Sequence, residues 1–335
     1  MKSRKKIIIF GATGNVGSYL VDYALNYFNA DEYEVIASGR RQTDFFTKRG
    51  IEYYPVDVTK EEDFEKLPTK DVYAVMLLSA QIPSYMDNYQ PRKYVDSIII
   101  GAYNVLEYCR KTKVDRIIYT QTVFDVSSYS HDIILKPNLA KCFSYMGDHA
   151  MYVISKNAAL EFIEHYHQEY GLKKFIFRLP TIYCYSPYQY YFPNGVKTMR
   201  PIYQMINKAK NSETLEVWGD PKYAKDMVHV NDFSQMLCKA VEVNREEGYY
   251  NVGTGIPVTL EEQVNTIVDE FSPKENPSQI IFCPDKPSTG GFLMDITNAK
   301  EELGYEPQYN CRKLLEDFKK EMELNKFKEL RILNI

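Results

Sequence analysis

A glycine-rich turn near the start of the sequence constrains the fold more than any other feature. Residues 10–17 read FGATGNVG, follow the apolar run KKIII, and precede an amphipathic helical pattern at 18–28. Gly11, Gly14 and Gly17 suit a tight strand-to-helix turn with close packing of the helix on the strand. The free N–H groups and the dipole at such a helix start bind phosphate. We interpret the segment as a dinucleotide-binding turn, with a glycine-rich turn that binds nothing as the alternative.

Strand-like runs and helical patterns alternate along the first 180 residues. The predicted strands, rich in Ile, Val and Tyr, are Lys6–Phe10, Glu34–Ser38, Glu52–Val56, Val72–Ser79, Arg116–Thr120 and Phe175–Leu179. The predicted helices are Ser18–Phe28, Glu61–Leu67, Arg92–Lys111 and Tyr152–Tyr170. Parallel strands need helix-sized connections, and these spacings supply them. The predicted fold class is α/β, with a Rossmann-type doubly wound parallel sheet.

The pattern changes after residue 180. Tyr, Pro and Asn become common, and the next predicted elements are a helix near Pro201–Lys210, a strand at Leu215–Trp218, a strand–helix pattern at 226–243 and a strand at Gln279–Cys283. We predict an NAD(P)-binding Rossmann domain and a smaller interleaved C-terminal substrate lobe. The Rossmann domain comprises 1–180 plus about 223–258, and the lobe comprises 181–222 and 259–335.

Composition excludes several classes of protein. The sequence has 45 acidic and 41 basic residues and a net charge of -4, which gives no basic surface for nucleic acid or an anionic membrane. No stretch approaches the roughly 20 apolar residues that span a bilayer. The six cysteines form no C-x-x-C pair and no metal-ligand spacing appears. We therefore predict a cytoplasmic protein with reduced thiols, no metal, and neither nucleic acid nor membrane as a partner.

Further motifs follow the glycine turn in a fixed order. They are DV at Asp57–Val58, LSAQ at Leu78–Gln81, TQTVF at Thr120–Phe124, Tyr152-x-x-x-Lys156, RLPTIY from Arg178, KDMVHVND from Lys225, YNVGTG from Tyr250 and DITNAKEELGY from Asp295. In this order, over nearly the full chain, they resemble the extended short-chain dehydrogenase/reductases, the NAD(P)-dependent sugar-nucleotide epimerase/dehydratase family.

The resemblance implies three catalytic residues, Thr120, Tyr152 and Lys156. Tyr152 and Lys156 are four residues apart, so they share one face of a helix. A free phenol has a pKa of about 10 and is a poor base at neutral pH, and we expect the Lys156 ammonium and a cationic nicotinamide to lower it. Thr120 would orient the reacting sugar hydroxyl. The alternatives are a surface helix pair and an ordinary threonine that ends a strand.

The two residues after Thr120 limit the reaction. The resemblance implies two acids there in 4,6-dehydratases, whereas this sequence has Gln121 and Thr122, which cannot serve as acid and base for elimination. The Cys and His pair of the epimerase-reductases is not evident either. Dehydratase chemistry is therefore disfavoured.

The cofactor is predicted from the end of the second strand. Arg40 and Arg41 stand there without an acid, and arginine suits the 2′-phosphate of NADP, so NADP is preferred over NAD. Alternatively, one arginine stacks on the adenine of NAD. The resemblance also implies further cofactor-binding residues: Gly11, Thr13, Gly14, Asn15, Val16, Gly17, Asp57, Val58, Leu78, Ser79, Ala80, Tyr152, Lys156 and Pro180.

The function that the resemblance implies best is epimerisation of a nucleotide-linked sugar through transient hydride transfer to a keto intermediate. The alternatives are an NADPH-dependent reductase or dehydrogenase of such a sugar and a catalytically silent dinucleotide-binding regulatory protein. Candidate substrate contacts are Gln81, Asn194, Arg200, Trp218 and Lys225. The apolar residues of Arg92–Lys111 and Tyr152–Tyr170 exceed one buried face, so we predict a homodimer through these two helices.

Overall fold

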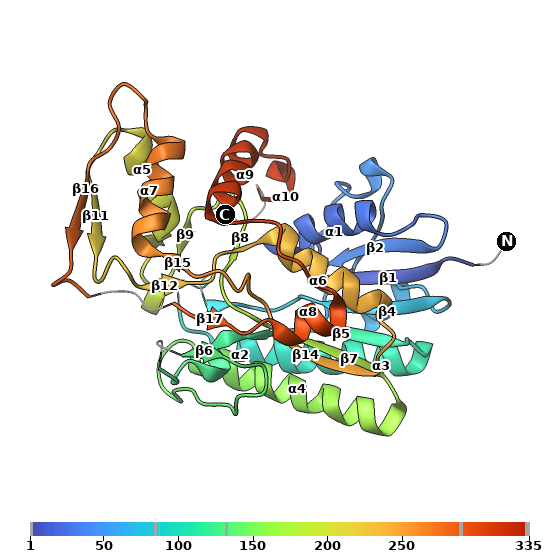
Figure 1. The fold of residues 1–335 in the computed structure, drawn as a ribbon. Helices are drawn as coiled ribbons and strands as arrows, with labels where there is room; N and C mark the ends of the chain where they lie inside the picture. Colours follow the sequence, from blue (N-terminus) through green and yellow to red (C-terminus); the bar gives the residue numbers. More distant parts are fainter. Residues whose placement is uncertain (1–2, 84–85, 87, 131–132, 288–290, 332–335) are drawn as a thin grey trace.

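The computed structural model describes residues 3–83, 86, 88–130, 133–287 and 291–331 and centres on one seven-stranded sheet (Figure 1). All neighbouring strands in it are parallel. Its order is β14 (Glu247–Asn251), β7 (Lys173–Leu179), β5 (Arg116–Thr122), β4 (Val72–Leu77), β1 (Lys5–Phe10), β2 (Tyr33–Gly39) and β3 (Glu52–Pro55). The chain order reverses between β1 and β4, which is where doubly wound sheets bind ligands. The predicted fold class is confirmed.

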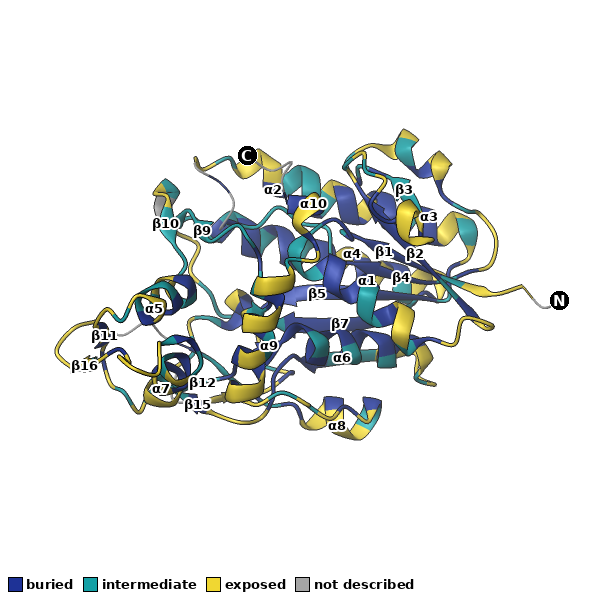
Figure 2. Cartoon of the chain, turned by 90° about the horizontal axis from the view of Figure 1, so that it is seen from above, coloured by how far each residue is buried: buried dark blue, intermediate teal, exposed yellow. Residues whose placement is uncertain are grey.

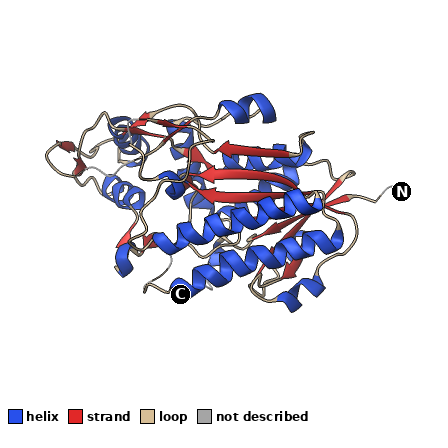
Figure 3. Ribbon diagram, turned by 90° about the horizontal axis from the view of Figure 1, so that it is seen from below, coloured by secondary structure: helices blue, strands red, loops and turns tan. Residues whose placement is uncertain are grey.

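The sheet is covered on both faces, as the continuous apolar runs of its strands require. Ile7 and Ile9 of β1 belong to the core under α1 (Asn15–Tyr27), α6 (Val230–Glu242) and α8 (Thr297–Leu303). Ile8 and Phe10 belong to the core under α3 (Gly101–Thr112) and α4 (Ala150–Tyr170). Figure 3 shows the two long helices side by side on their face of the sheet. Alternate residues of one strand therefore build two separate cores.

A third core lies beyond one end of the sheet (Figures 1 and 2). Its helices are α5 (Pro201–Lys210), α7 (Leu260–Phe271) and α9 (Cys311–Leu324), and its strands are β11 (Leu215–Trp218) and β16 (Ile280–Cys283), which pair in parallel. The remaining two-residue strands form four separate pairs: β6 (Ile134–Leu135) with β17 (Leu293–Met294), β8 (Ile182–Tyr183) with β13 (Val228–His229), β9 (Tyr190–Tyr191) with β10 (Thr198–Met199), and β12 (Ala224–Lys225) with β15 (Val258–Thr259). The predicted domain boundaries stay a prediction, and α8, inside the predicted lobe, packs on α6 and β14 of the sheet.

Several element predictions need correction. The predicted helix at 61–67 is a 3-10 helix, Glu61–Lys66, and the predicted single helix at 92–111 is three segments: α2 (Pro91–Tyr94), a π-helical segment Val95–Ile100, and α3. The strand predicted to end at Thr120 continues to Thr122, because Gln121 and Thr122 still pair with Arg178 and Leu179 of β7. Among the described residues no helix is long and apolar enough to cross a membrane.

Candidate active site

The glycine turn has the geometry of a close backbone approach. Gly11 has φ +93°, a left-handed conformation that favours glycine, and a Cβ there would lie 3.0 Å from the Ser79 nitrogen. A Cβ on Gly17 would lie 2.1 Å from the Gly11 carbonyl oxygen, which no side chain could accommodate. The turn therefore brings α1, β1 and the end of β4 together at the switch point of the sheet.

The first turn of α1 fits a dinucleotide pyrophosphate. Gly14 is the N-cap residue, and within the described residues no side chain caps the helix and no acid lies in its first turn. The amide groups of Asn15, Val16 and Gly17 begin the helix, where N–H groups and the dipole favour an anion. Thr13 is buried, and a Cβ on Gly39, the last residue of β2, would lie 2.7 Å from its Oγ1. This geometry is compatible with the predicted dinucleotide-binding turn, and the contacts of these residues with a cofactor stay predictions.

The rear of this turn is held by residues far away in the sequence. Arg331, in the short helix α10 (Lys328–Arg331), donates from Nη1 to the Thr13 carbonyl at 3.1 Å. It also donates from Nη2 to the Asn15 carbonyl at 3.1 Å and to Ser18 Oγ at 2.7 Å. The Asn15 side chain contacts Cys184 Sγ at 3.1 Å. Sequence reasoning missed Arg331, because no local pattern links it to a turn more than 300 residues earlier.

The remaining predicted cofactor residues lie around the carboxyl ends of the strands. Asp57 and Val58 follow β3, Leu78, Ser79 and Ala80 follow β4, and Pro180 follows β7. Asp57 Oδ1 accepts hydrogen bonds from the amide and hydroxyl of Thr59 at 3.1 and 2.9 Å. The fold thus brings the set to one edge of the sheet, and their contacts with a cofactor stay predictions.

Arg40 and Arg41 lie at the end of β2 in different surroundings. Arg40 is exposed, whereas Arg41 is half-buried and donates to the Leu330 carbonyl, with Tyr53 Oη donating to the Arg41 carbonyl at 2.5 Å. Burial, followed by the charges of Arg331 and Arg40, lowers the pKa of Arg41. Three guanidinium groups therefore gather beside the glycine turn.

Tyr152 and Lys156 share the buried face of α4. Lys156 is 3% exposed, and its Nζ donates to the Thr120 carbonyl oxygen at 2.6 Å and lies 4.7 Å from the Tyr119 ring centroid. Tyr152 is 9% exposed and its ring lies 6.0 Å from that of Tyr94. The helix therefore points the pair toward the carboxyl end of β5.

The expected lowering of the Tyr152 pKa is not what the protein alone produces. Burial raises the pKa of Tyr152 to about 12, and a hydrogen bond with the Thr122 side chain opposes this only in part. Burial also lowers the pKa of Lys156 to about 7, since a desolvated ammonium loses its charge readily. The protein alone therefore does not favour the phenolate, and the lowering expected with a bound cationic nicotinamide stays a prediction.

The pKa of Lys156 predicts a pH-dependent stability. The unfolded lysine keeps its proton up to about pH 10, so between pH 7 and that value the unfolded state binds more protons, and the free energy of unfolding rises with pH. Relative to a Lys156→Met variant, we expect the wild type to gain up to about 1 kcal/mol per pH unit above pH 7. Urea denaturation of both proteins at about pH 6.5 and about pH 8.5 measures this. An equal difference at both values would contradict a buried Lys156 that loses its proton.

Two threonines, Thr120 and Thr122, lie near Tyr152 and Lys156, where the sequence predicted a role for Thr120 alone. The Thr120 hydroxyl donates to the Leu77 carbonyl at 3.4 Å, while its own carbonyl holds Lys156. Thr122, not singled out as a site residue, is the threonine whose side chain hydrogen-bonds Tyr152. Between them, Gln121 bonds Asn157 Oδ1 at 2.9 Å and accepts from the Thr122 amide at 2.9 Å. The catalytic role of Thr120 stays a prediction, with Thr122 as a second candidate.

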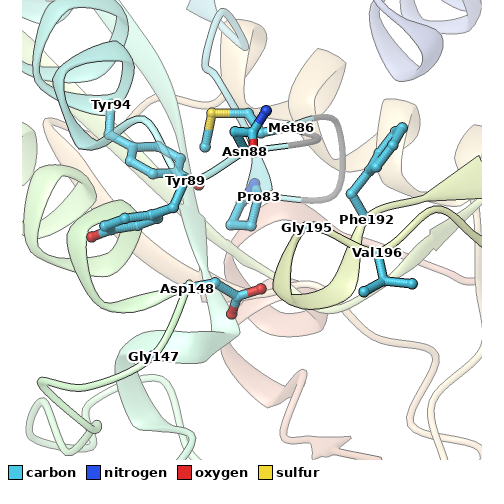
Figure 4. Close-up of a pocket in the computed structure, with 10 residues that line it drawn as sticks. All are labelled: Pro83, Met86, Asn88, Tyr89, Tyr94, Gly147, Asp148, Phe192, Gly195 and Val196. Carbon is cyan, nitrogen blue, oxygen red and sulfur yellow. The ribbon is translucent and has the colours of Figure 1, made fainter.

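A cavity of about 430 Å³ (Figure 4) is lined in part by Tyr94, whose ring lies 6.0 Å from that of Tyr152. Its lining comes from Pro83, Met86, Asn88, Tyr89, Tyr94, Gly147, Asp148, Phe192, Gly195 and Val196. These residues belong to the segment after β4, the segment before α4 and the 3-10 turn Pro193–Gly195. Sequence reasoning did not single out this lining, because the segments carry no shared motif.

The predicted substrate contacts lie mostly outside this cavity. Asn194 is in the 3-10 turn that borders it, but its side chain is not among those that the structure describes. Arg200 Nε donates to the Tyr190 carbonyl at 3.3 Å, and the backbone N–H of Gln81 donates to Ser97 Oγ at 3.0 Å. Trp218 is half-exposed under Lys286, and Lys225 lies in β12. Their substrate roles stay predictions.

The described residues contain no group of three His, Cys, Asp or Glu side chains that could hold a metal.

Comparisons with known proteins agree with this fold. The family model of the NAD dependent epimerase/dehydratase family matches residues 7–253. UDP-glucuronic acid decarboxylase 5 of Arabidopsis thaliana is 24% identical, over 97% of this chain and 92% of its own. UDP-glucose 4-epimerase of Thermotoga maritima, solved with UDP-glucose, superposes with a TM-score of 0.75 at 22% identity, covering 95% of this chain and 99% of its own. UDP-glucuronic acid 4-epimerase of Bacillus cereus, solved with NAD, superposes with a TM-score of 0.71 at 17% identity, covering 97% of this chain and 99% of its own.

Proposed function

The chain belongs to the NAD dependent epimerase/dehydratase family, and on that premise we propose that it epimerises a nucleotide-linked sugar with a bound nicotinamide dinucleotide. The observation that carries the proposal is the buried Tyr152–Lys156 pair. Lys156 bonds the Thr120 carbonyl near the carboxyl end of β5, and the Tyr152 ring lies 6.0 Å from that of Tyr94 in the cavity wall. A protein that only sensed a dinucleotide would have no need of a buried proton-transfer group next to an open cavity.

Tyr152, Lys156 and Thr122 have separate roles in the proposed reaction. Tyr152 Oη takes the proton from the sugar hydroxyl and later returns it to the resulting carbonyl oxygen. Lys156, fixed by the Thr120 carbonyl, supplies a positive charge that lowers the cost of the phenolate, and Thr122 steadies the phenol oxygen. A nicotinamide dinucleotide held at the glycine turn would supply the acceptor and donor of the hydride. An epimerase returns that hydride to the other face of the carbon, so it needs no second base.

The side chains after Thr120 support this reaction over elimination. Gln121 is 1% exposed and its amide bonds Asn157 and the Thr122 backbone, so it offers no titrating proton. Thr122 is buried and neutral. A 4,6-elimination needs an acid and a base at the sugar, and these two positions provide neither.

The absorbance of the reduced nicotinamide during turnover distinguishes an epimerase from a reductase. An epimerase shows no net change in absorbance of the reduced nicotinamide while chromatography resolves the two epimers. Stoichiometric loss of NADPH during turnover would contradict the epimerase proposal and support the reductase, which the arginines beside the turn also favour. A purified protein that binds nucleotide sugars and dinucleotide but converts none of them would support a regulatory role.

We further propose that NADP is preferred over NAD and that Arg40 is the main reason. Arg41 is engaged by the Leu330 carbonyl, while Arg40 is exposed at the end of β2, where a 2′-phosphate would lie. Arg40→Ala should weaken NADP binding by about tenfold or more and leave NAD binding nearly unchanged. Isothermal titration with both cofactors measures this, with Arg49→Ala, an exposed arginine paired with Asp22, as control. Equal losses for both cofactors would mean that Arg40 only stacks on adenine.

A homodimer through α3 and α4 is part of the proposal. Both helices expose large apolar or aromatic side chains, which are Ile100 just before α3, Tyr103 on it, and Phe162 and Tyr170 on α4. A two-fold axis would bury this patch against its own copy. We expect light scattering at micromolar concentration to give twice the chain mass of 39.1 kDa, and Tyr103→Glu to give the single mass. A wild-type monomer would contradict the prediction.

The cytoplasmic location stays a prediction from the sequence.

A further inference from the structure

Helix α10 is fixed against the start of α1 by apolar packing (Figure 1). Phe327, directly before α10, is buried, and its ring lies 4.6 Å from that of Tyr19 on α1 and 6.0 Å from that of Phe45. Leu330 is buried in the same core. A four-residue helix is not stable by itself, so this packing holds α10 in place.

From this anchor, the guanidinium of Arg331 reaches three acceptors in and around the first turn of α1. They are the Thr13 carbonyl, the Asn15 carbonyl and Ser18 Oγ, at 3.1, 3.1 and 2.7 Å. Arg331 is buried, and its guanidinium is planar, with donors in a rigid arrangement. One side chain therefore fixes the last residues of the glycine turn relative to the helix that follows it.

Holding these carbonyls also fixes the direction of amides that face the other way. A peptide unit is planar and trans, so its C=O and N–H groups point in opposite directions. The Thr13 carbonyl shares its peptide unit with the Gly14 amide, which closes the turn by donating to the Gly11 carbonyl at 2.8 Å. The Asn15 carbonyl shares its peptide unit with the amide of Val16, which is one of the amides at the start of α1.

We propose that Arg331 is a positioning residue for the dinucleotide: from α10 it fixes the amides of the glycine turn in the orientation that binds a pyrophosphate. The inference rests on the proposed function, since it assigns this turn to the dinucleotide. A turn that is ordered before the ligand arrives avoids the entropic cost of ordering on binding. Such a turn also suits an epimerase, which keeps its cofactor bound while the hydride leaves the sugar and returns.

The test is the dinucleotide affinity of Arg331→Met, which keeps an apolar side chain and removes every donor. Isothermal titration should show NAD and NADP binding weakened alike by about tenfold, because both contain the pyrophosphate, with UDP binding unchanged. Arg331→Lys should recover part of the loss, since an ammonium can still donate to one acceptor. The control is Arg312→Met, which removes an exposed guanidinium of α9 paired with Asp269 and Glu270 and should change neither affinity.

Hydrogen exchange separates positioning from a general loss of stability. In protein without cofactor, Arg331→Met should exchange the amides of residues 13–18 faster than the wild type and those of β5 and β7 at the same rate. Ser18→Ala keeps the test decisive if Arg331→Met does not fold. It removes one acceptor of Arg331, keeps a good helix former, and should weaken NAD and NADP binding several-fold.

Three results would count against the inference. Undiminished dinucleotide binding or unchanged exchange of residues 13–18 in a folded Arg331→Met, or undiminished binding by Ser18→Ala where that variant alone folds, would overturn the inference and leave the proposed function intact. A loss confined to NADP would also overturn it, because Arg331 would then act on the 2′-phosphate. A wild type that binds neither NAD nor NADP would contradict the proposed function and this inference with it.

Discussion

Tyr152→Phe is expected to reduce turnover by a factor of about 10²–10⁴, the usual contribution of a positioned general acid and base. The substitution removes one oxygen from a side chain that is 9% exposed and leaves the ring packed beside Tyr94. Steady-state rates with a nucleotide sugar that the wild type converts measure the loss. The KM for the sugar should change little, because the proton transfer acts on the transition state rather than on binding.

Two controls separate this loss from a folding defect. The variant should bind the dinucleotide as tightly as the wild type, and its free energy of unfolding should fall by only about 1 kcal/mol, the usual contribution of the one hydrogen bond that it loses. Thr122→Val should have a smaller effect, since Thr122 acts on the reaction only through Tyr152. Near-normal activity of Tyr152→Phe would mean that the reaction takes place elsewhere in the protein.

Asp125→Ala is expected to reduce the free energy of unfolding by about 3–5 kcal/mol, the largest stability effect predicted for a single residue. Asp125 is 1% exposed and Arg178 is 2% exposed, and they are paired through Arg178 Nε and Asp125 Oδ1 at 2.9 Å. Arg178 also donates to the Pro137 carbonyl at 3.0 Å and to Asn251 Oδ1 at 3.2 Å. Removing the carboxylate would leave a buried guanidinium without its counter-charge.

Urea denaturation of the wild type and the variant measures this difference. The matched control is Asp44→Ala, which removes the carboxylate from an exposed pair with Lys48 and should cost little, since exposed pairs contribute about 0–1 kcal/mol. A loss of less than about 1 kcal/mol for Asp125→Ala would contradict the view that the buried pair fastens the end of β5 to β7.

The sequence predicted the features that depend on local pattern. The strand at 5–10, the glycine turn and the helix after it lie within a few neighbouring residues, so periodicity and glycine spacing reveal them. The same holds for the i, i+4 relation of Tyr152 and Lys156. Six of the seven strands of the parallel sheet follow because they are apolar and separated by helix-sized segments, whereas β14 was not predicted as a strand.

The features that escaped prediction depend on contacts between distant segments or on desolvation. The pKa of Tyr152 is set by how deeply the fold buries it, which a sequence does not show. The hydrogen bond of Thr122 depends on β5 continuing for two residues, which pairing with β7 decides. The π-helical segment Val95–Ile100 interrupts a pattern that reads as one helix. The cavity wall combines segments around residues 83–94, 147–148 and 192–196, which only the folded chain brings together.

The contact between Arg331 and the glycine turn has a consequence for the order of events during synthesis. The bond from Arg331 to the Thr13 carbonyl spans 318 positions in the chain. At about 5–20 residues per second, a ribosome needs about 15–65 s to make the intervening chain. The first βαβ unit can form during that time, but the Thr13 carbonyl then has no Arg331 guanidinium from which to accept a hydrogen bond. The turn thus gains its full set of contacts only after α10 has been made, so tight cofactor retention should follow the synthesis of that helix.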